Sequence, residues 1–256
     1  MEENIISLQE LMPLALRING RWVDNDACWR VRNDYNRDGS VAFNRTDKIQ
    51  LGAGRTTNLR TLIEAMFVAN VGEWKYKPEA TFFTNSRNES VSVFDYVVRF
   101  LTNPGNNPSL KWSLMLYGTP GTGKTCLMQS IQRTLVKLYE NETSNSKPKI
   151  IYVKASALGE MLKDEKERYK EYRNATVLFI DDLGFGGEEE MVNDYGSKRY
   201  PIEEIIEHRY DKRLMTICTS NMTKPEFEKH YGIKIFSRFC EMFAFVPMNG
   251  IDLRKV

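Results

Sequence analysis

The sequence Gly118-Thr-Pro-Gly-Thr-Gly-Lys-Thr125 fits the pattern G-x-x-x-x-G-K-[ST] at every fixed position. Glycines lack a Cβ atom, so the backbone can curl and direct its N–H groups toward phosphate oxygens. An apolar strand, Ser113 to Tyr117, leads into the pattern, and a helix that begins at Lys124 leads out. The positive end of that helix favours an anion. The stretch therefore predicts a phosphate-binding loop.

The last two residues of this loop are expected to carry most of its chemistry. Lys124 is expected to reach the β- and γ-phosphates of a nucleotide, and the Thr125 hydroxyl is a candidate ligand of Mg²⁺. A glycine-rich turn without any ligand is the alternative. The predicted nucleotide contacts within the loop are Gly118, Thr119, Pro120, Gly121, Thr122, Gly123, Lys124 and Thr125.

A second predicted site follows the apolar strand Val177-Leu-Phe-Ile180, which ends in Asp181 and Asp182. This is the Walker B pattern, and in open α/β sheets ligands lie at the carboxyl ends of the strands. Asp181 is expected to hold Mg²⁺ through water, together with Thr125. Asp182 is expected to position or activate the attacking water. Two acids that merely begin a solvated loop are the alternative.

Two more polar residues are candidates near the end of the chain. Asn221 follows an apolar strand, 214–219, and would come near the γ-phosphate if that strand lay between the loop strand and the acid strand. A β-turn asparagine is the alternative. Arg238 is of the type that stabilises phosphate charge from a neighbouring subunit. Its surroundings alone indicate a surface arginine with a packed stem.

The second part of the chain alternates apolar strands with helices. This rhythm predicts an α/β fold, a mostly parallel sheet covered by helices on both faces. The expected strands are 112–117, 150–153, 176–180, 214–219 and 243–246, and the expected helices are 93–101, 124–139, 157–172, 202–210, 224–231 and 235–242.

The first third of the chain has a different texture. Residues 20–50 are rich in Trp, Arg, Asn and Asp without a clear period, whereas Asn58 to Asn70 places apolar side chains on one helical face. We therefore expect an N-terminal region, residues 1–88, and a second unit, residues 89–256, that holds the sheet and the phosphate loop.

The composition excludes several classes of protein. Of the 256 residues, 41% are hydrophobic and 27% charged, with a net charge of +2, so any DNA contact needs a local patch. The four cysteines are scattered and only two histidines are present, which argues against a zinc site and for free thiols. No stretch is long enough to span a bilayer and the N-terminus has no basic signal region, so we expect a cytoplasmic protein without membrane contact.

The order of these motifs resembles that of AAA+ ATPases of the DnaC/IstB type, the bacterial helicase loaders and transposition helper ATPases. The resemblance runs from about residue 93 to residue 256, and the pairing of an SRF-like segment with a DLRK-like segment is more specific to this group than the other motifs are. The matching stretches are YGTPGTGKTC (117–126), VLFIDDLG (177–184), TICTSN (216–221), IFSRF (235–239) and NGIDLRK (249–255).

This resemblance implies roles that the residues alone do not assign. Asn221 is similar to sensor 1, Arg238 to the arginine finger that acts across a subunit interface, and Arg254 to the sensor 2 arginine. It further implies ATP with Mg²⁺ as the ligand, Cys126 beside the nucleotide, and a P-loop AAA+ core without a C-terminal helical lid. The implied catalytic set is Lys124, Asp182, Asn221 and Arg238.

The resemblance also implies partners and an activity. It predicts an ATPase that forms an ATP-dependent homo-oligomer on single-stranded DNA, with a replicative helicase or a transposase as its partner and residues 1–88 as the partner-binding region. A helicase loader acting in DNA replication is the leading hypothesis. The alternatives are an IstB-type transposition helper on duplex DNA and a nucleotide-binding adaptor with little hydrolysis. Asp182 stands where many relatives have the longer Glu, so slow hydrolysis is expected.

Overall fold

The computed structural model describes residues 63–64, 66–68, 70–71, 82–84, 88, 90–102, 111–138, 148–184, 191–194 and 197–255, with short strands among the first 51 residues. The expected helix at Asn58 to Asn70 is helical at 63–64, 66–68 and 70, and the rest of that range lies outside the described residues.

Five parallel strands form the central sheet, in the order β14-β8-β13-β10-β9. The parallel sheet expected from the sequence is confirmed. Because β13 lies between β8 and β10, the residues that follow these three strands meet at one edge of the sheet. The strands are β8 (Ser113–Tyr117), β9 (Ile150–Lys154), β10 (Val177–Leu183), β13 (Met215–Ser220) and β14 (Phe243–Pro247).

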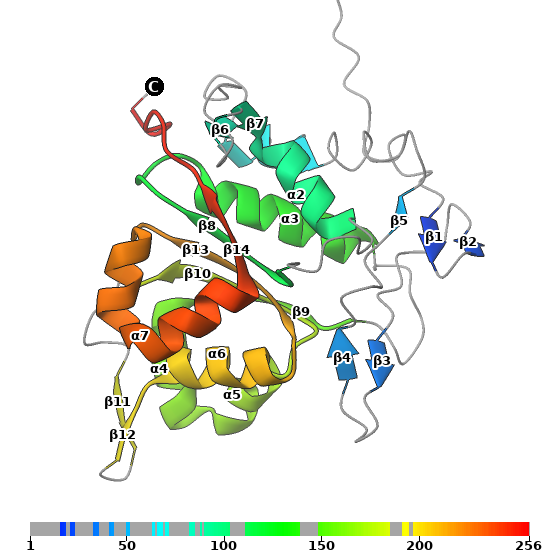
Figure 1. The fold of residues 1–256 in the computed structure, drawn as a ribbon. Helices are drawn as coiled ribbons and strands as arrows, with labels where there is room; N and C mark the ends of the chain where they lie inside the picture. The colour runs from blue at the N-terminus through cyan, green and yellow to red at the C-terminus, as the bar shows by residue number, and fades with distance from the viewer. Residues whose placement is uncertain are drawn as a thin grey trace, which may run out of the picture.

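Helices cover both faces of the sheet, as expected (Figure 1). In Figure 1, α2 and α3 lie on one side of the strands, and α4 to α7 lie on the other. The helices are α2 (Val93–Thr102), α3 (Lys124–Leu138), α4 (Ala155–Asp164), α5 (Lys166–Arg173), α6 (Pro201–Asp211) and α7 (Lys224–Met242).

The two faces of the sheet share the apolar residues of each strand by alternation. Leu114 and Leu116 of β8 belong to the core under α2 and α3, whereas Met115 between them belongs to the core under α4 to α7. Successive side chains of a strand point to opposite faces, so a strand buried on both sides needs an unbroken apolar run. This explains why the central strands lack the apolar–polar alternation of a half-exposed sheet.

Three local features differ from the expected elements. The single helix expected at 157–172 is divided at Glu165 (φ −131°, ψ 55°) into α4 and α5. The two short helices expected at 224–231 and 235–242 form one assigned element, α7, which Gly232 (φ 74°, ψ 161°) interrupts with a kink. After the acid strand, β11 (Val192–Asp194) and β12 (Ser197–Arg199) form an antiparallel ladder that the sequence did not indicate.

Short strands occur before residue 93. Among them β1 pairs with both β2 and β5, β3 pairs with β4, and β6 pairs with β7, all antiparallel. Their bounds are β1 (Leu16–Ile18), β2 (Arg21–Val23), β3 (Asn33–Tyr35), β4 (Val41–Phe43), β5 (Gln50–Leu51), β6 (Phe82–Thr84) and β7 (Ser90–Ser92).

Helical residues at 63–64, 66–68 and 70–71, called the helical segment 63–71 after its ends, include two that pack on the core of the sheet. Ile63 and Phe67 are fully buried in the same cluster as α2 and α3, and the rings of Phe67 and Phe94 meet edge to face with centroids 5.5 Å apart. These residues precede the expected boundary at 88/89, yet they share the core of the second unit. The boundary itself stays a prediction.

None of the described helices combines the length and the apolar character that crossing a bilayer requires.

Candidate functional site

The phosphate loop connects β8 to α3 and has the backbone that its glycines permit. Gly118 and Gly121 both have positive φ angles, +130° and +79°, which residues with a Cβ atom rarely adopt. A Cβ atom at Gly121 would lie 1.8 Å from Oδ1 of Asp252, and one at Gly118 would lie 2.4 Å from Oδ1 of Asn249. The positive φ angles therefore favour glycine at both positions, and at Gly118 the backbone carbonyl oxygen of Met248, 2.8 Å from such a Cβ atom, leaves no room for a side chain.

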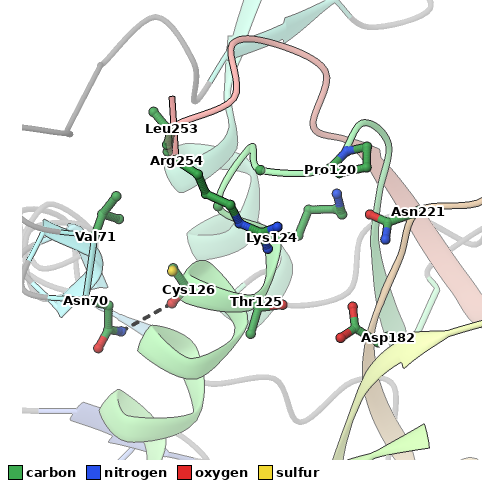
Figure 2. A pocket seen from close by; sticks show the side chains of 12 residues that line it. Asn70, Val71, Pro120, Lys124, Thr125, Cys126, Asp182, Asn221, Leu253 and Arg254 are labelled. Carbon is green, nitrogen blue, oxygen red and sulfur yellow. Dashed lines mark hydrogen bonds between the residues drawn. The ribbon is translucent and has the colours of Figure 1, made fainter. Parts of the chain in front are cut away.

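A cavity of about 420 Å³ lies against the loop (Figure 2), a size typical of small-molecule sites. It brings together residues from the loop, from the acid strand, from the position that follows β13 and from the C-terminal segment. Among the residues predicted from the sequence, those that line it are Pro120, Gly121, Gly123, Lys124, Thr125, Cys126, Asp182, Asn221 and Arg254.

Lys124 is almost fully buried at the base of this cavity, with 6% of its surface exposed. Its ammonium group donates hydrogen bonds to the carbonyl oxygens of Gly118 (2.9 Å) and Thr119 (2.6 Å). Burial lowers the pKa of Lys124 to about 8, with Arg254 acting in the same direction, while Asp182 and Asp181 oppose the shift. A cation held in a poorly solvated site gains more from phosphate oxygens than an exposed lysine does.

This lowered pKa predicts a pH dependence of nucleotide binding. Phosphates bind the protonated form of Lys124, which predominates below its pKa of about 8 in the free protein. Between pH 7 and 8 the affinity for ATP should change little. Above pH 8 binding must take up a proton, so the affinity should fall, by up to about tenfold per pH unit. Titration of a fluorescent ATP analogue from pH 7 to pH 10 measures this, and a constant affinity up to pH 10 would contradict it.

Asp181 is buried beside the loop, with 1% of its surface exposed, and it does not itself line the cavity. Its Oδ1 accepts hydrogen bonds from the hydroxyls of Thr125 (2.9 Å) and Thr219, and its Oδ2 accepts one from the Tyr152 hydroxyl (2.7 Å). The Thr125 oxygen keeps lone pairs after donating its proton. Oxygen ligands of this kind, few in number and completed by phosphates, fit Mg²⁺.

Asp182 and Asn221 lie on the strand side of the cavity, across from Arg254 (Figure 2). Asp182 has a positive φ of 58°, and its backbone N–H donates to the Thr219 hydroxyl (2.9 Å). Burial raises the pKa of Asp182, and Asp181 adds to the shift, while Lys154 and other nearby cations oppose it. A carboxylate with a raised pKa is a better proton acceptor than an ordinary aspartate.

The two candidate arginines are placed differently. Arg254 lines the cavity, and the neighbouring Leu253 N–H donates to the Gly121 carbonyl oxygen (2.9 Å), which fixes the segment on the loop. Arg238 on α7 does not line the cavity. Its guanidinium donates to Oε1 of Glu207 (2.9 Å) and lies over the ring of Tyr210.

Three of the predicted loop contacts, Gly118, Thr119 and Thr122, do not line the cavity. The Thr119 N–H donates to Oδ1 of Asn249 (3.3 Å), and the buried Thr122 hydroxyl donates to the Thr119 carbonyl oxygen (2.9 Å). Gly118 accepts from Lys124 and likewise does not line the cavity. These residues shape the loop in this structure.

The sequence did not point to three residues that line the cavity, Asn70, Val71 and Leu253. Asn70 donates from its side-chain amide to the Cys126 carbonyl oxygen (3.3 Å) and to the Ser130 hydroxyl (2.8 Å), so it ties the helical segment 63–71 to α3. Only the fold brings residue 70 to the loop, because no motif surrounds it. Leu253 belongs to the terminal segment in which only Arg254 had been singled out.

Comparison with known families gives one match to a family model. Residues 114–229 match the ATPase family associated with various cellular activities (AAA). The match spans the loop, both aspartates and Asn221, and the expected AAA+ fold is confirmed. A comparison with curated protein sequences gives no match.

Several solved structures are similar in fold. The crystal structure of the DnaC helicase loader is 21% identical, with a TM-score of 0.46, over 72% of this chain and 99% of that chain. The crystal structure of DnaI is 25% identical, with a TM-score of 0.47, over 63% of this chain and 82% of that one. AMPPCP-bound DnaA from Aquifex aeolicus is 21% identical, with a TM-score of 0.43, over 65% of this chain and 51% of that one.

Proposed function

We propose, from the match of residues 114–229 to the AAA ATPase family, that the chain is an ATP-dependent DNA replication factor of the helicase-loader kind. The single observation that carries the ATPase part is the cavity, where Lys124, Asp182, Asn221 and Thr125 converge, with Thr125 hydrogen-bonded to the buried Asp181. The loader part rests on the resemblance of the segments at 235–239 and 249–255 to those of DnaC/IstB-type proteins.

Each residue has a distinct part in the proposed hydrolysis of ATP. The loop backbone and Lys124 bind the phosphates, and Thr125 and Asp181 would hold Mg²⁺, which neutralises phosphate charge when bound. Asp182 orients the attacking water and accepts its proton, and Asn221 helps to orient that water. Aspartate reaches less far than glutamate, so we propose slow turnover in which ATP acts as a switch.

The proposal also assigns partners. Residues 1–88 would bind the replicative helicase, and the ATP-bound form would assemble as a homo-oligomer on single-stranded DNA. Asn70 supports a link between the two activities, because it precedes residue 88 and yet contacts α3 and lines the nucleotide cavity. The described cysteines, Cys126, Cys218 and Cys240, are free thiols, which agrees with the cytoplasm as the proposed location.

Arg238 provides the test of the assembled site. A residue that completes a neighbour's site must lie outside the cavity of its own chain, and Arg238 does, with 24% of its side chain exposed. We expect Arg238→Ala to bind ATP as the wild type does but to lose hydrolysis by about 10³-fold, the lower end for such arginines. ATP turnover and apparent mass, measured with and without single-stranded DNA, check this.

Lys234→Ala is the matched control for Arg238→Ala. Lys234 also pairs with Oε1 of Glu207 (3.0 Å) and belongs to α7, but its side chain is far more exposed. We expect Lys234→Ala to keep hydrolysis and assembly. If wild type and Arg238→Ala both stay monomeric and hydrolyse ATP equally, Arg238 is a surface arginine and the loader proposal fails.

A further inference from the structure

Tyr152 is a residue of the site that neither the motifs nor the cavity lining reveals. It lies on β9, the edge strand next to β10, and is paired in register with Phe179, two residues before Asp181. Side chains two residues apart on a strand share a face, so Tyr152 reaches the acid strand on the side of Asp181. Its hydroxyl donates to Oδ2 of Asp181 at 2.7 Å.

Three hydroxyl groups donate hydrogen bonds to the Asp181 carboxylate, and together they fix its orientation. Each carboxylate oxygen can accept about two hydrogen bonds. Oδ1 of Asp181 accepts from Thr125 and Thr219, so both of its positions are used. Oδ2 accepts from Tyr152, which leaves one position. The three donors come from α3, β13 and β9, so the plane of the carboxylate is held from three elements.

We propose that Tyr152 is a positioning residue for Mg²⁺-ATP. Its hydroxyl fixes the orientation of the Asp181 carboxylate, so that Oδ1 keeps the hydrogen bond from Thr125. One acceptor position of Oδ2 then remains for the cation through its water. Outer-shell partners of this kind orient the groups that bind a metal and commonly change its affinity by 10–100-fold. The inference rests on the proposed ATPase function and assigns a further residue to it.

Tyr152→Phe removes this hydrogen bond, together with the longer one that the Tyr152 hydroxyl accepts from the side-chain amide of Gln129 (3.5 Å). The ring stays in place on a half-buried position of the edge strand, so folding should be retained, which circular dichroism checks. Of the three hydroxyl donors to Asp181, Tyr152 alone bonds Oδ2. Without it, the carboxylate can turn away from Thr125. Tyr152 does not line the cavity, so binding of metal-free ATP should not change.

The experiment compares the affinity of a fluorescent, non-hydrolysable ATP analogue at saturating Mg²⁺ and in EDTA. We expect Mg²⁺ to tighten binding to the wild type, and this gain to be about tenfold smaller in Tyr152→Phe. Affinities in EDTA should be equal. Tyr169→Phe is the matched control, because its buried hydroxyl donates to the Pro201 carbonyl oxygen (2.8 Å) away from the cavity, and it should behave as wild type.

Two other outcomes would overturn the inference. An equal Mg²⁺-dependent gain in wild type and Tyr152→Phe would show that the hydroxyl does not position Asp181. An equal loss of affinity in EDTA and in Mg²⁺ would show a merely structural role. If the wild type itself gains nothing from Mg²⁺, the proposed ATPase function fails first, so the two failures are distinguishable.

Discussion

Replacing Lys124 by alanine is expected to weaken ATP binding about a hundredfold, because the variant loses charge-assisted hydrogen bonds to two phosphates. In the free protein the ammonium group is bonded to the carbonyl oxygens of Gly118 and Thr119, so it already lies at the loop. Because the side chain of Lys124 is buried, water does not readily take the place of its ammonium group in the alanine variant. Titration of a fluorescent ATP analogue measures the loss of affinity.

The control for this prediction is a lysine outside the site. Lys149→Ala removes an exposed lysine that pairs with Glu171 (3.2 Å), and we expect its ATP affinity to equal that of the wild type. Thermal melting of both variants separates binding from folding. An unchanged affinity in a folded Lys124→Ala variant would mean that the nucleotide is not held by this loop.

The second large effect concerns stability. Arg209 on α6 is fully buried, and burial lowers its pKa to about 9. Its guanidinium donates to the Thr216 hydroxyl (2.8 Å) and to the carbonyl oxygens of Ala175 (2.8 Å), Arg173 (3.0 Å) and Met215 (2.5 Å). It thereby joins α6 to the starts of two central strands. Arg209→Leu removes the donor from all four acceptors, at about 1–3 kcal/mol for each one that is left buried and that water cannot reach.

We therefore expect Arg209→Leu to lower the free energy of unfolding by about 3–5 kcal/mol, since leucine packing offsets only part of the loss. Urea denaturation followed by circular dichroism measures this change. Arg168→Ala is the control, because Arg168 makes an exposed pair with Glu165 on the helix surface, and its midpoint should match that of the wild type. A midpoint for Arg209→Leu equal to that of the control would contradict the prediction.

The sheet and the loop could be predicted from the sequence because their signals are local. A strand buried on both faces must be continuously apolar, and the loop glycines have conformations that other residues avoid. The position of Asn221 followed from one assumption, that its strand lies between those of the loop and the acids, and the strand order confirms that assumption.

Residues that depend on tertiary contacts could not be predicted in the same way. Asn70 and Val71 lie far from the loop in the sequence, and only the packing of Phe67 on the core brings them to the cavity. In the sequence, nothing distinguishes Tyr152 from any other aromatic residue of a strand. Only the pairing with Phe179 shows that it lies beside Asp181. The ladder of β11 and β12 follows the stretch GFGGEEE (184–190), which is rich in glycine and glutamate, a composition that indicates a loop.

ATP turnover by the purified wild-type protein shows whether this cavity hydrolyses ATP. The measurement is made in Mg²⁺ and in EDTA, beside Lys124→Ala as the background and with nucleotide binding followed in parallel. We expect slow hydrolysis above that background in Mg²⁺ and none in EDTA. Wild-type protein that binds ATP in Mg²⁺ but turns it over no faster than Lys124→Ala would contradict it and would identify a nucleotide-binding adaptor instead.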